Sequence, residues 1–133
     1  MIVVDASVFA NALLDDGDVG EHARSHLAGD SHWLGPDHLR VEVYSVIRGL
    51  SLGGKVASGR AVEALDVLAE VVIETVPVAP LLGRMWELRD NLSGYDAAYV
   101  AAAESEGCSL VTADQRLARA PGLQCEVRLA LPK

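Results

Sequence analysis

The sequence predicts an α/β fold in which a central, mainly parallel sheet is covered by helices on both faces. Short apolar runs alternate with longer amphipathic stretches along all 133 residues, and no hairpin turn joins two of the runs. Half of the residues are hydrophobic, but only one Phe, two Trp and three Tyr are present, so Ala, Val and Leu must build the core. A chain of this size buries about two-thirds of its unfolded surface. We therefore expect one domain, spanning residues 1–133.

The first three predicted elements are a strand and two helices. Residues 2–4 are apolar throughout and end at Asp5, which is typical of a buried central strand. Residues 6–14 form a helical stretch, and residues 19–27 follow as an amphipathic helix. The acidic segment between these helices lacks the ligand spacing of a calcium loop, so we interpret it as a turn.

The middle of the chain contains one predicted strand and two long helices. Residues 32–34 can form a strand before Gly35 and Pro36, and Asp37 is placed to cap the next helix. That helix ends near Gly53, and its apolar residues at helical spacing are Leu39, Val43, Val46, Ile47 and Leu50. Residues 56–71 form a second helix, and the residues expected on its apolar face are Val62, Leu65, Leu68 and Ala69.

The last third of the chain alternates regularly between strands and helices. Residues 72–78 read as a strand bounded by prolines, and residues 81–89 as a helix. After a turn at 91–94, an Ala-rich helix covers 95–106 and closes at Gly107. The remaining predicted elements are a strand at 109–112, a short helix at 114–119 and a strand at 125–129.

Charge and composition exclude several classes of protein. The formal net charge of −8 argues against binding nucleic acid through net charge alone. No apolar stretch reaches the ~20 residues that a bilayer span requires, so we expect no membrane association. The N-terminus has no basic region and carries Asp5 where a signal peptide would be apolar, which predicts a cytoplasmic protein. Cys108 and Cys125 have no metal-knuckle spacing, and free thiols are favoured over one disulfide between them.

Four acidic residues are candidates for one site. Asp5 and Asp114 follow predicted strands, and Asp96 lies in the first turn of the helix that precedes the second of these strands. In an open parallel sheet, ligands bind beyond the carboxyl ends of the strands. Glu42 is three residues from Leu39 and four from Val46, so it faces inward, where a carboxylate needs a partner.

Each acid also has a plain structural interpretation. Asp96 could support a capping box begun by Ser93, and Asp114 could cap the helix that follows it. Four acids gathered at one sheet edge would nevertheless repel one another strongly unless a divalent cation lay among them. Hard oxygen ligands suit Mg²⁺ or Mn²⁺ rather than zinc. The joint pattern favours a metal site.

Four segments that contain these acids resemble, in order, the PIN-domain ribonucleases, and within them the VapC-type toxins of toxin–antitoxin pairs. The segments are VVDASV at 3–8, RVEV at 40–43 with VIR at 46–48, LSGYDAAYVA at 92–101 and LVTADQRL at 110–117. The resemblance covers essentially the whole chain. It implies a PIN-like three-layer sandwich with about four or five strands in its central sheet.

The resemblance also implies the roles of individual residues. Asp5, Glu42, Asp96 and Asp114 match the acidic quartet of the family, both as catalytic residues and as metal ligands, with Mg²⁺ as the cofactor and Mn²⁺ as an alternative. Ser7 and Thr112 look like the hydroxyl residues that orient this quartet. Tyr99 stands where some relatives carry a further acid, which leaves open whether one metal ion is held or two.

The implied activity is hydrolysis of RNA phosphodiesters by metal-activated water, which inhibits translation and growth until an antitoxin neutralises the enzyme. The implied partners are the RNA substrate, a cognate VapB-type antitoxin and a second copy of the chain in a homodimer. Promoter DNA would be contacted only indirectly, through the antitoxin. The predicted helices at 39–50 and 56–71 are more apolar than a small monomer needs, so they are candidate antitoxin surfaces.

Three other interpretations stay open at this point. A PIN nuclease that processes RNA without being a toxin shares every site residue. A receiver-like signalling domain needs a Lys after its last strand, and the only lysines are Lys55 and Lys133. A catalytically inactive binding module would have lost one of the four acids.

The basic residues and histidines give weaker signals. Cations that could line the approach to the acids and hold phosphates, or that could simply be solvated, are Arg40, Arg48, Lys55, Arg60, Arg84 and Arg89. His22 and His26 are one helical turn apart, but their polar flanks indicate a solvated face. His32 and His38 flank a loop and show no pattern.

Overall fold

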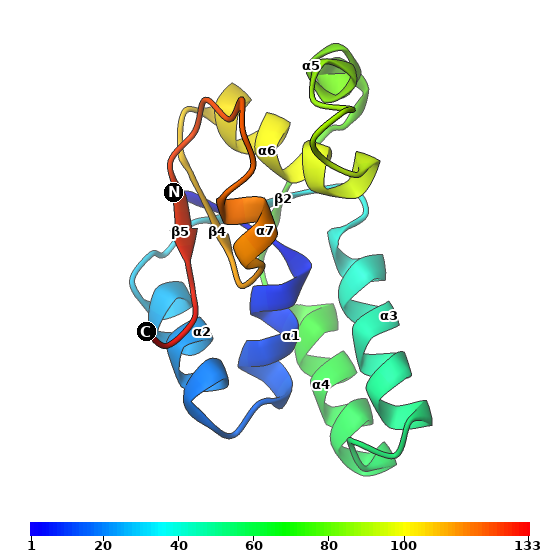
Figure 1. Cartoon of the computed structure of the whole chain (residues 1–133). Helices are drawn as coiled ribbons and strands as arrows, with labels where there is room; N and C mark the ends of the chain where they lie inside the picture. Colours follow the sequence, from blue (N-terminus) through cyan, green and yellow to red (C-terminus); the bar gives the residue numbers. More distant parts are fainter.

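Five parallel strands form the central sheet of the computed structural model, which describes residues 1–133 (Figure 1). The strand order is β3-β2-β1-β4-β5, and every neighbouring pair is parallel. The strands are β1 (Ile2–Val4), β2 (Trp33–Pro36), β3 (Glu74–Val76), β4 (Ser109–Thr112) and β5 (Val127–Leu129). The predicted α/β fold with a parallel sheet of about four or five strands is therefore confirmed.

The strand order reverses direction between β1 and β4. From β1 the chain proceeds outward to β2 and β3, then crosses back to β4 and continues to β5 on the other side. In the centre of the sheet, Val3 pairs with Leu34 of β2 on one side and with Leu110 of β4 on the other. This reversal point, at the carboxyl ends of β1 and β4, is where open α/β sheets bind ligands.

Helices cover both faces of the sheet (Figure 1). The first layer consists of α1 (Ala6–Leu14), α2 (Asp18–Ala28), α3 (Leu39–Leu52) and α4 (Ser58–Glu70), which pack against one another. On the opposite face, α6 (Gly94–Glu106) contacts β1, β2 and β4, with α5 (Leu82–Glu87) and the 3₁₀ turn η1 (Ala79–Leu81) against it. The short helix α7 (Gln115–Ala118) connects β4 to β5. None of the helices is long and apolar enough to cross a membrane.

The core is built from small and branched aliphatic residues, as the composition predicts. One cluster of 29 buried hydrophobic residues joins the strands to both helix layers. Helix α6 is buried continuously from Ala97 to Ala103, because its alanines let the helix lie close to the sheet. It begins at the Ser93 cap and ends at Gly107, whose φ of 66° favours glycine. Cys108 and Cys125 are free thiols, in agreement with the favoured interpretation.

Several predicted boundaries were wrong because long-range pairing decides them. Strand β2 continues through Gly35 and Pro36, which pair with β3, and a Cβ atom at Gly35 would overlap the Leu39 side chain. Asp37 does not cap α3; its carboxylate accepts a 3.4 Å hydrogen bond from the Val78 N–H instead. Strand β3 is shorter than predicted because residues outside Glu74–Val76 find no partner strand, and β5 begins at Val127 rather than at residue 125.

The predicted inward faces of α3 and α4 also need correction. Helix α4 buries Ala61, Ala64 and Leu68, while Val62 is exposed. On α3, Val46 is exposed rather than part of the buried stripe. Helical periodicity identifies which residues share a face, but it does not decide how far an apolar face extends beyond the core contact. The two helices therefore leave apolar side chains in contact with solvent.

Candidate active site

The Asp5 carboxylate is the most deeply buried of the four predicted acids. It caps α1, accepting hydrogen bonds from the Ser7 N–H at 3.1 Å and the Val8 N–H at 3.3 Å. The hydroxyl of Ser7 donates to the same oxygen at 2.5 Å, and the hydroxyl of Thr112 donates to the other oxygen. The two hydroxyl residues singled out from the sequence thus both contact Asp5, one from α1 and one from β4.

Burial makes Asp5 an unusual carboxyl group. The pKa of Asp5 is raised to about 6, mainly by burial and to a smaller extent by the nearby negative charge of Asp96. The hydrogen bonds from Ser7, Thr112 and Val8 oppose this shift by stabilising the ionised form, but they do not cancel it. No cationic side chain compensates the charge of Asp5, since none forms an ion pair with it.

Asp96 and Asp114 line the same surface hollow, together with Asn91, Ser93 and Arg116. Asp114 follows β4, donates its N–H to the Thr112 hydroxyl at 3.0 Å and caps α7 by accepting the Arg116 N–H at 2.9 Å. Asp96 is on the first turn of α6, where its own N–H is capped by the Ser93 hydroxyl at 3.2 Å. Its carboxylate makes no reciprocal bond to the Ser93 N–H, so the capping box is incomplete and the carboxylate stays available.

Glu42 lies one helical turn from His38, at the N-terminal end of α3. The His38 Nε2 atom is 2.7 Å from the Glu42 Oε1 atom, and both side chains are partly buried, with 21% and 31% of their surface exposed. The His38 ring lies against two tyrosines, with centroids 5.3 Å from the Tyr95 ring and 5.2 Å from the Tyr99 ring. The buried atoms His38 Nε2, Glu42 Oε1 and the Tyr99 hydroxyl all lack a well-aligned hydrogen bond. Such a group of unsatisfied polar atoms is rare in a folded interior.

His38 was missed by the sequence analysis. Its spacing of four residues from Glu42 on one helix is the signal that could have identified it. Burial lowers the pKa of His38, which favours the neutral ring, while the charges of Asp37 and Asp96 oppose that effect. Burial raises the pKa of Glu42; the Tyr99 hydroxyl lowers it and the charge of Asp96 raises it.

Asp96 connects the four acids electrostatically. Its charge raises the pKa of Asp5 and of Glu42, and its own pKa is raised by burial and then by the charge of Asp114. The four carboxylates therefore border one region, although no three ligating side chains converge into a ready-made metal cage. The donor set fits a hard divalent cation, because it consists of carboxylate oxygens and includes the Glu42 Oε1 atom, which lacks a well-aligned hydrogen bond.

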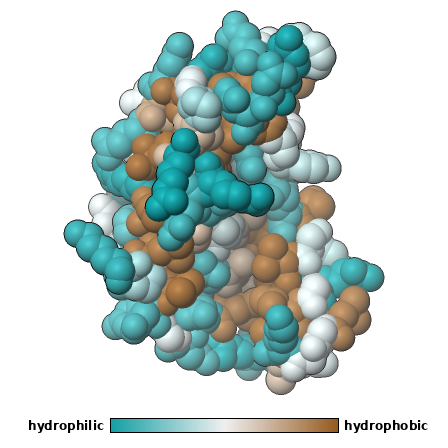
Figure 2. All heavy atoms as spheres, in the orientation of Figure 1, coloured by the Kyte–Doolittle hydropathy of each residue, from teal (hydrophilic) through white to brown (hydrophobic).

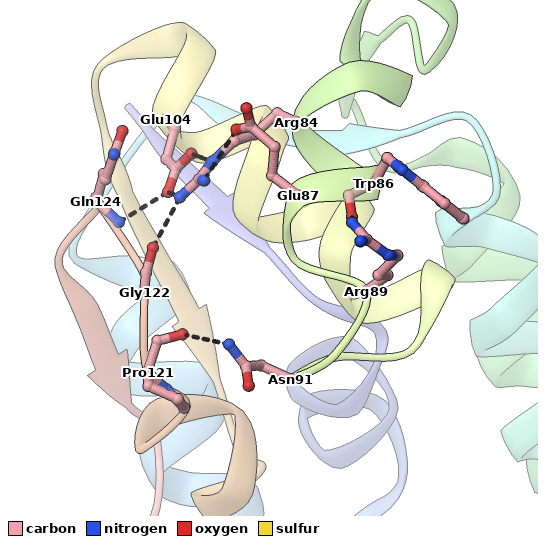
Figure 3. A network of polar contacts seen from close by, with 9 residues as sticks. All are labelled: Arg84, Trp86, Glu87, Arg89, Asn91, Glu104, Pro121, Gly122 and Gln124. Atoms are coloured by element: carbon pink, nitrogen blue, oxygen red, sulfur yellow. Dashed lines mark hydrogen bonds and ion pairs between the residues drawn. The ribbon is translucent and has the colours of Figure 1, made fainter.

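Several arginines that could have held phosphates are engaged elsewhere. Arg40 donates to the Leu68 carbonyl of α4 and to the carbonyl of Val71, which follows the helix, and Arg60 pairs with Asp16. Arg84 is held by Glu104, Glu87 and the Gly122 carbonyl in a polar network between α5, α6 and the loop before β5 (Figure 3). The cation beside the acids is Arg116, whose Nε atom is 3.8 Å from Asp114.

Comparison with known proteins supplies the family context. The PIN domain family model matches residues 2–123. Ribonuclease VapC9 of Mycobacterium tuberculosis is 39% identical over 127 residues, covering 96% of each chain, and Ribonuclease VapC1 of the same species is 38% identical over 128 residues with the same coverage.

Solved structures share the fold at lower identity. The M. tuberculosis toxin VapC20, described as cleaving the sarcin-ricin loop, has a TM-score of 0.67 at 20% identity over 89% of this chain and 93% of its own. VapBC2 of Rickettsia felis, bound to a promoter DNA fragment, has a TM-score of 0.64 at 18% identity over 96% of this chain and 98% of its own.

Proposed function

The chain belongs to the PIN-domain family and, within it, to the VapC ribonucleases, and from this premise we propose that it is the Mg²⁺-dependent endoribonuclease toxin of a VapBC-type pair. The observation that carries the proposal is the arrangement at the reversal point of the sheet. Four carboxylates from four separate segments border one region there, and burial raises the pKa of Asp5, Glu42 and Asp96. Perturbed acids in such a position are candidates for catalysis.

Asp5 and Asp96 are the proposed direct metal ligands, and Asp114 would ligate directly or through water. Glu42 would either ligate or accept a proton from the attacking water. Ser7 and Thr112 hold the Asp5 carboxylate from both sides, so that its oxygens keep a fixed direction. When bound, Mg²⁺, with Mn²⁺ as an alternative, lowers the pKa of a coordinated water and neutralises charge at phosphorus.

The chemistry of this site requires no 2′-hydroxyl nucleophile. Water that attacks in line with the leaving 3′ oxygen gives products with 5′-phosphate and 3′-hydroxyl ends. His38 is the one histidine beside the acids, and burial disfavours its charged form, so the chain offers no pair of histidines for acid–base cleavage through the 2′-hydroxyl. Cleavage of cellular RNA would inhibit translation and growth, and we expect it to occur in the cytoplasm, where the substrate is.

The proposed partners are a VapB-type antitoxin and a second copy of the chain. Apolar side chains gather over α1, α3 and α4 (Figure 2). A groove between α1, α3 and the α3–α4 loop is lined by the apolar residues Ala10, Leu14, Val46, Leu50 and Val56 together with three polar ones, Asn11, Asp15 and Lys55. An antitoxin segment with an apolar face fits this groove, and a basic segment would complement the acidic site. Promoter DNA would be contacted through the antitoxin rather than by this acidic chain.

Mapping the 5′ ends of cellular RNA tests the proposed activity. Wild type, Asp5→Ala, Asp96→Ala and a control, Asp66→Ala on the exposed side of α4, are expressed separately. New 5′-phosphate ends and growth arrest are expected with wild type and the control, and neither is expected with the two site variants. The same ends from all four proteins would refute the nuclease site. Cleavage without growth arrest would instead support an RNA-processing nuclease that is not a toxin.

A further inference from the structure

Tyr95 presents an aromatic ring to solvent at the edge of the acidic site. It directly precedes Asp96 in the first turn of α6, and its side chain is 65% exposed. Its ring lies 5.3 Å from the ring of His38, which in turn is 2.7 Å from the Glu42 carboxylate. The ring is therefore supported on one side by the site and open on the other. Exposing this much aromatic surface contributes nothing to the core.

Two arginines lack a close carboxylate partner: Arg116, which lines the hollow of Asp96 and Asp114, and Arg89, which precedes that lining in the sequence. Arg116 is 94% exposed, and its only ion pair, to Asp114, is long at 3.8 Å. Arg89 makes no ion pair; it lies over the exposed Trp86 ring at 4.4 Å and donates to the Trp86 carbonyl. Asn91, two residues after Arg89, lines the hollow that contains Asp96 and Asp114.

Figure 3 shows Arg84 of α5 and Arg89, which follows α5, pointing in different directions. Arg84 points toward Glu104 and the loop before β5, while Trp86 and Arg89 lie on the opposite side of the helix. Arg84 has its charge fully compensated, so it cannot serve a phosphate. Arg89 has no such compensation, and its guanidinium is available to an anion. In a chain with a net charge of −8, exposed cations with weak or no carboxylate partners, such as Arg116 in the hollow, are the places where RNA phosphates can approach.

We propose that Tyr95 stacks an unpaired nucleobase of single-stranded RNA beside the scissile phosphate, with Arg116 contacting a neighbouring phosphate and the Trp86–Arg89 pair offering a second stacking position. This inference rests on the proposed nuclease function and adds the residue that would position the base next to the cleaved bond. Stacking on an exposed aromatic ring is tolerant of base identity, because every base has a π face. A paired base inside a helix cannot reach the ring, so duplex RNA is excluded from this position.

Binding of a fluorescein-labelled, mixed-sequence 12-nucleotide RNA, measured by anisotropy in Ca²⁺ buffer to suppress cleavage, tests the proposal. Tyr95→Ala is expected to bind about tenfold more weakly than wild type, and Tyr95→Phe to bind within about twofold of wild type, because the ring is retained. Tyr44→Ala is the matched control, since Tyr44 is an exposed tyrosine on α3. Arg116→Ala should reduce the slope of log K against log salt by about 0.7, as expected for one lost phosphate contact. The duplex of the same RNA should compete poorly.

Two further measurements keep this inference separate from the proposed function. Mn²⁺ binding to Tyr95→Ala, measured by calorimetry, should match wild type, which excludes damage to the acids. If wild type cuts RNA and Tyr95→Ala binds the 12-mer as tightly as wild type, the stacking role is wrong and the nuclease proposal survives. An altered oligomeric state of Tyr95→Ala in light scattering, with unchanged RNA affinity, would assign the ring to a contact between copies and also overturn the proposal.

Discussion

Two polar regions of this molecule differ in whether their charged side chains have partners of opposite charge. One region, which we call the arginine clasp, consists of Arg84, Glu104, Glu87, Gly122 and Gln124. Every charged side chain in the clasp has a partner. The Arg84 guanidinium donates to both Glu104 oxygens at 2.7 and 3.1 Å and to the Gly122 carbonyl at 2.7 Å, and the Gln124 N–H also donates to Glu104 at 2.7 Å. Glu104 raises the pKa of Arg84 further above its usual range.

At the reversal point of the sheet, by contrast, several acidic side chains lie near one another. The pKa values of Asp5, Glu42 and Asp96 are raised by burial, and Asp96 adds to the shifts of the other two. Three buried polar atoms in the same region have no aligned partner. The clasp ties α5, α6 and the loop before β5 together, so its charges serve the fold. Buried acids with raised pKa values cluster at functional sites, which favours a ligand-binding role for these acids.

The largest expected difference between the two regions is in catalysis. Asp96→Asn should reduce RNA cleavage about a thousandfold or more, because a proposed metal ligand is lost while the shape is kept. Glu104→Gln, its matched counterpart in the clasp, should leave the rate within about threefold of wild type. Single-turnover cleavage of a labelled RNA at saturating Mg²⁺ measures both. Equal losses of cleavage rate in the two variants would show that the two regions do not differ in their importance for catalysis.

The second difference concerns pH. The pKa of Asp5 is raised from 3.8 to about 6 in the folded protein, so between these values the folded state binds more protons than the unfolded state. Stability of the metal-free protein should therefore fall as pH rises from 4 to 6, by about 2 kcal/mol for this group alone. Urea unfolding in EDTA at several pH values measures it.

Asp5→Asn supplies the control for the pH effect. It keeps the shape of the side chain but cannot ionise, so its stability should change less over this range, and it should exceed that of wild type at pH 7. A metal-free wild type whose stability rises steadily from pH 4 to 7 would contradict an uncompensated Asp5. Addition of Mn²⁺ should restore the stability of wild type at pH 7 but not alter that of the variant.

The third difference concerns the stability of the fold, which we expect to depend on the arginine clasp. Arg84→Ala should destabilise the fold by about 2 kcal/mol, because Glu104 loses a two-pronged, charge-assisted partner in a partly buried position. Arg128→Ala, which removes an exposed pair with Glu126, should change stability by less than about 0.5 kcal/mol. Denaturant midpoints of the two variants give the comparison. Retained cleavage by Arg84→Ala in folding conditions would show that the clasp supports the fold and not the chemistry.

The smallest effect is expected at His38. If His38 holds the Glu42 carboxylate, His38→Phe should fill the space between Tyr95 and Tyr99 yet weaken Mn²⁺ binding about tenfold. His38→Gln retains an N–H donor and should bind Mn²⁺ nearly as well as wild type. In a Glu42→Gln background, His38→Phe should have no further effect. Full Mn²⁺ affinity in His38→Phe would leave the histidine as a packing residue only.

The sequence predicts those parts of the fold and of the candidate site that depend on local order. The apolar run of β1 ending at Asp5, and Thr112 followed by Asp114, place two acids at one edge as soon as the sheet is parallel. The cap at Ser93 and the αL glycine at 107 are also local signals. Glu42 could be singled out because a charge on an apolar helical face requires a reason.

What could not be predicted depends on contacts between distant segments. Gly35 and Pro36 look like a turn until β3 pairs with them, and Asp37 looks like a cap until the Val78 N–H approaches it. The place of His38 beside the site could not be predicted, because it depends on α6, which brings Tyr95 and Tyr99 against the His38 ring. The sequence likewise does not show that Arg84 forms ion pairs whereas Arg89 lies over an aromatic ring, because their partners are set by the fold.

Calorimetric titration of Mn²⁺ into metal-free protein tests the central claim, that the uncompensated acids at the sheet edge hold a divalent cation. Wild type and Arg84→Ala are expected to bind at least one ion with the same affinity, while Asp96→Asn and Asp5→Asn should bind at least about a hundredfold more weakly. Wild-type affinity in both acid variants would contradict the account, because the ion would then be held elsewhere.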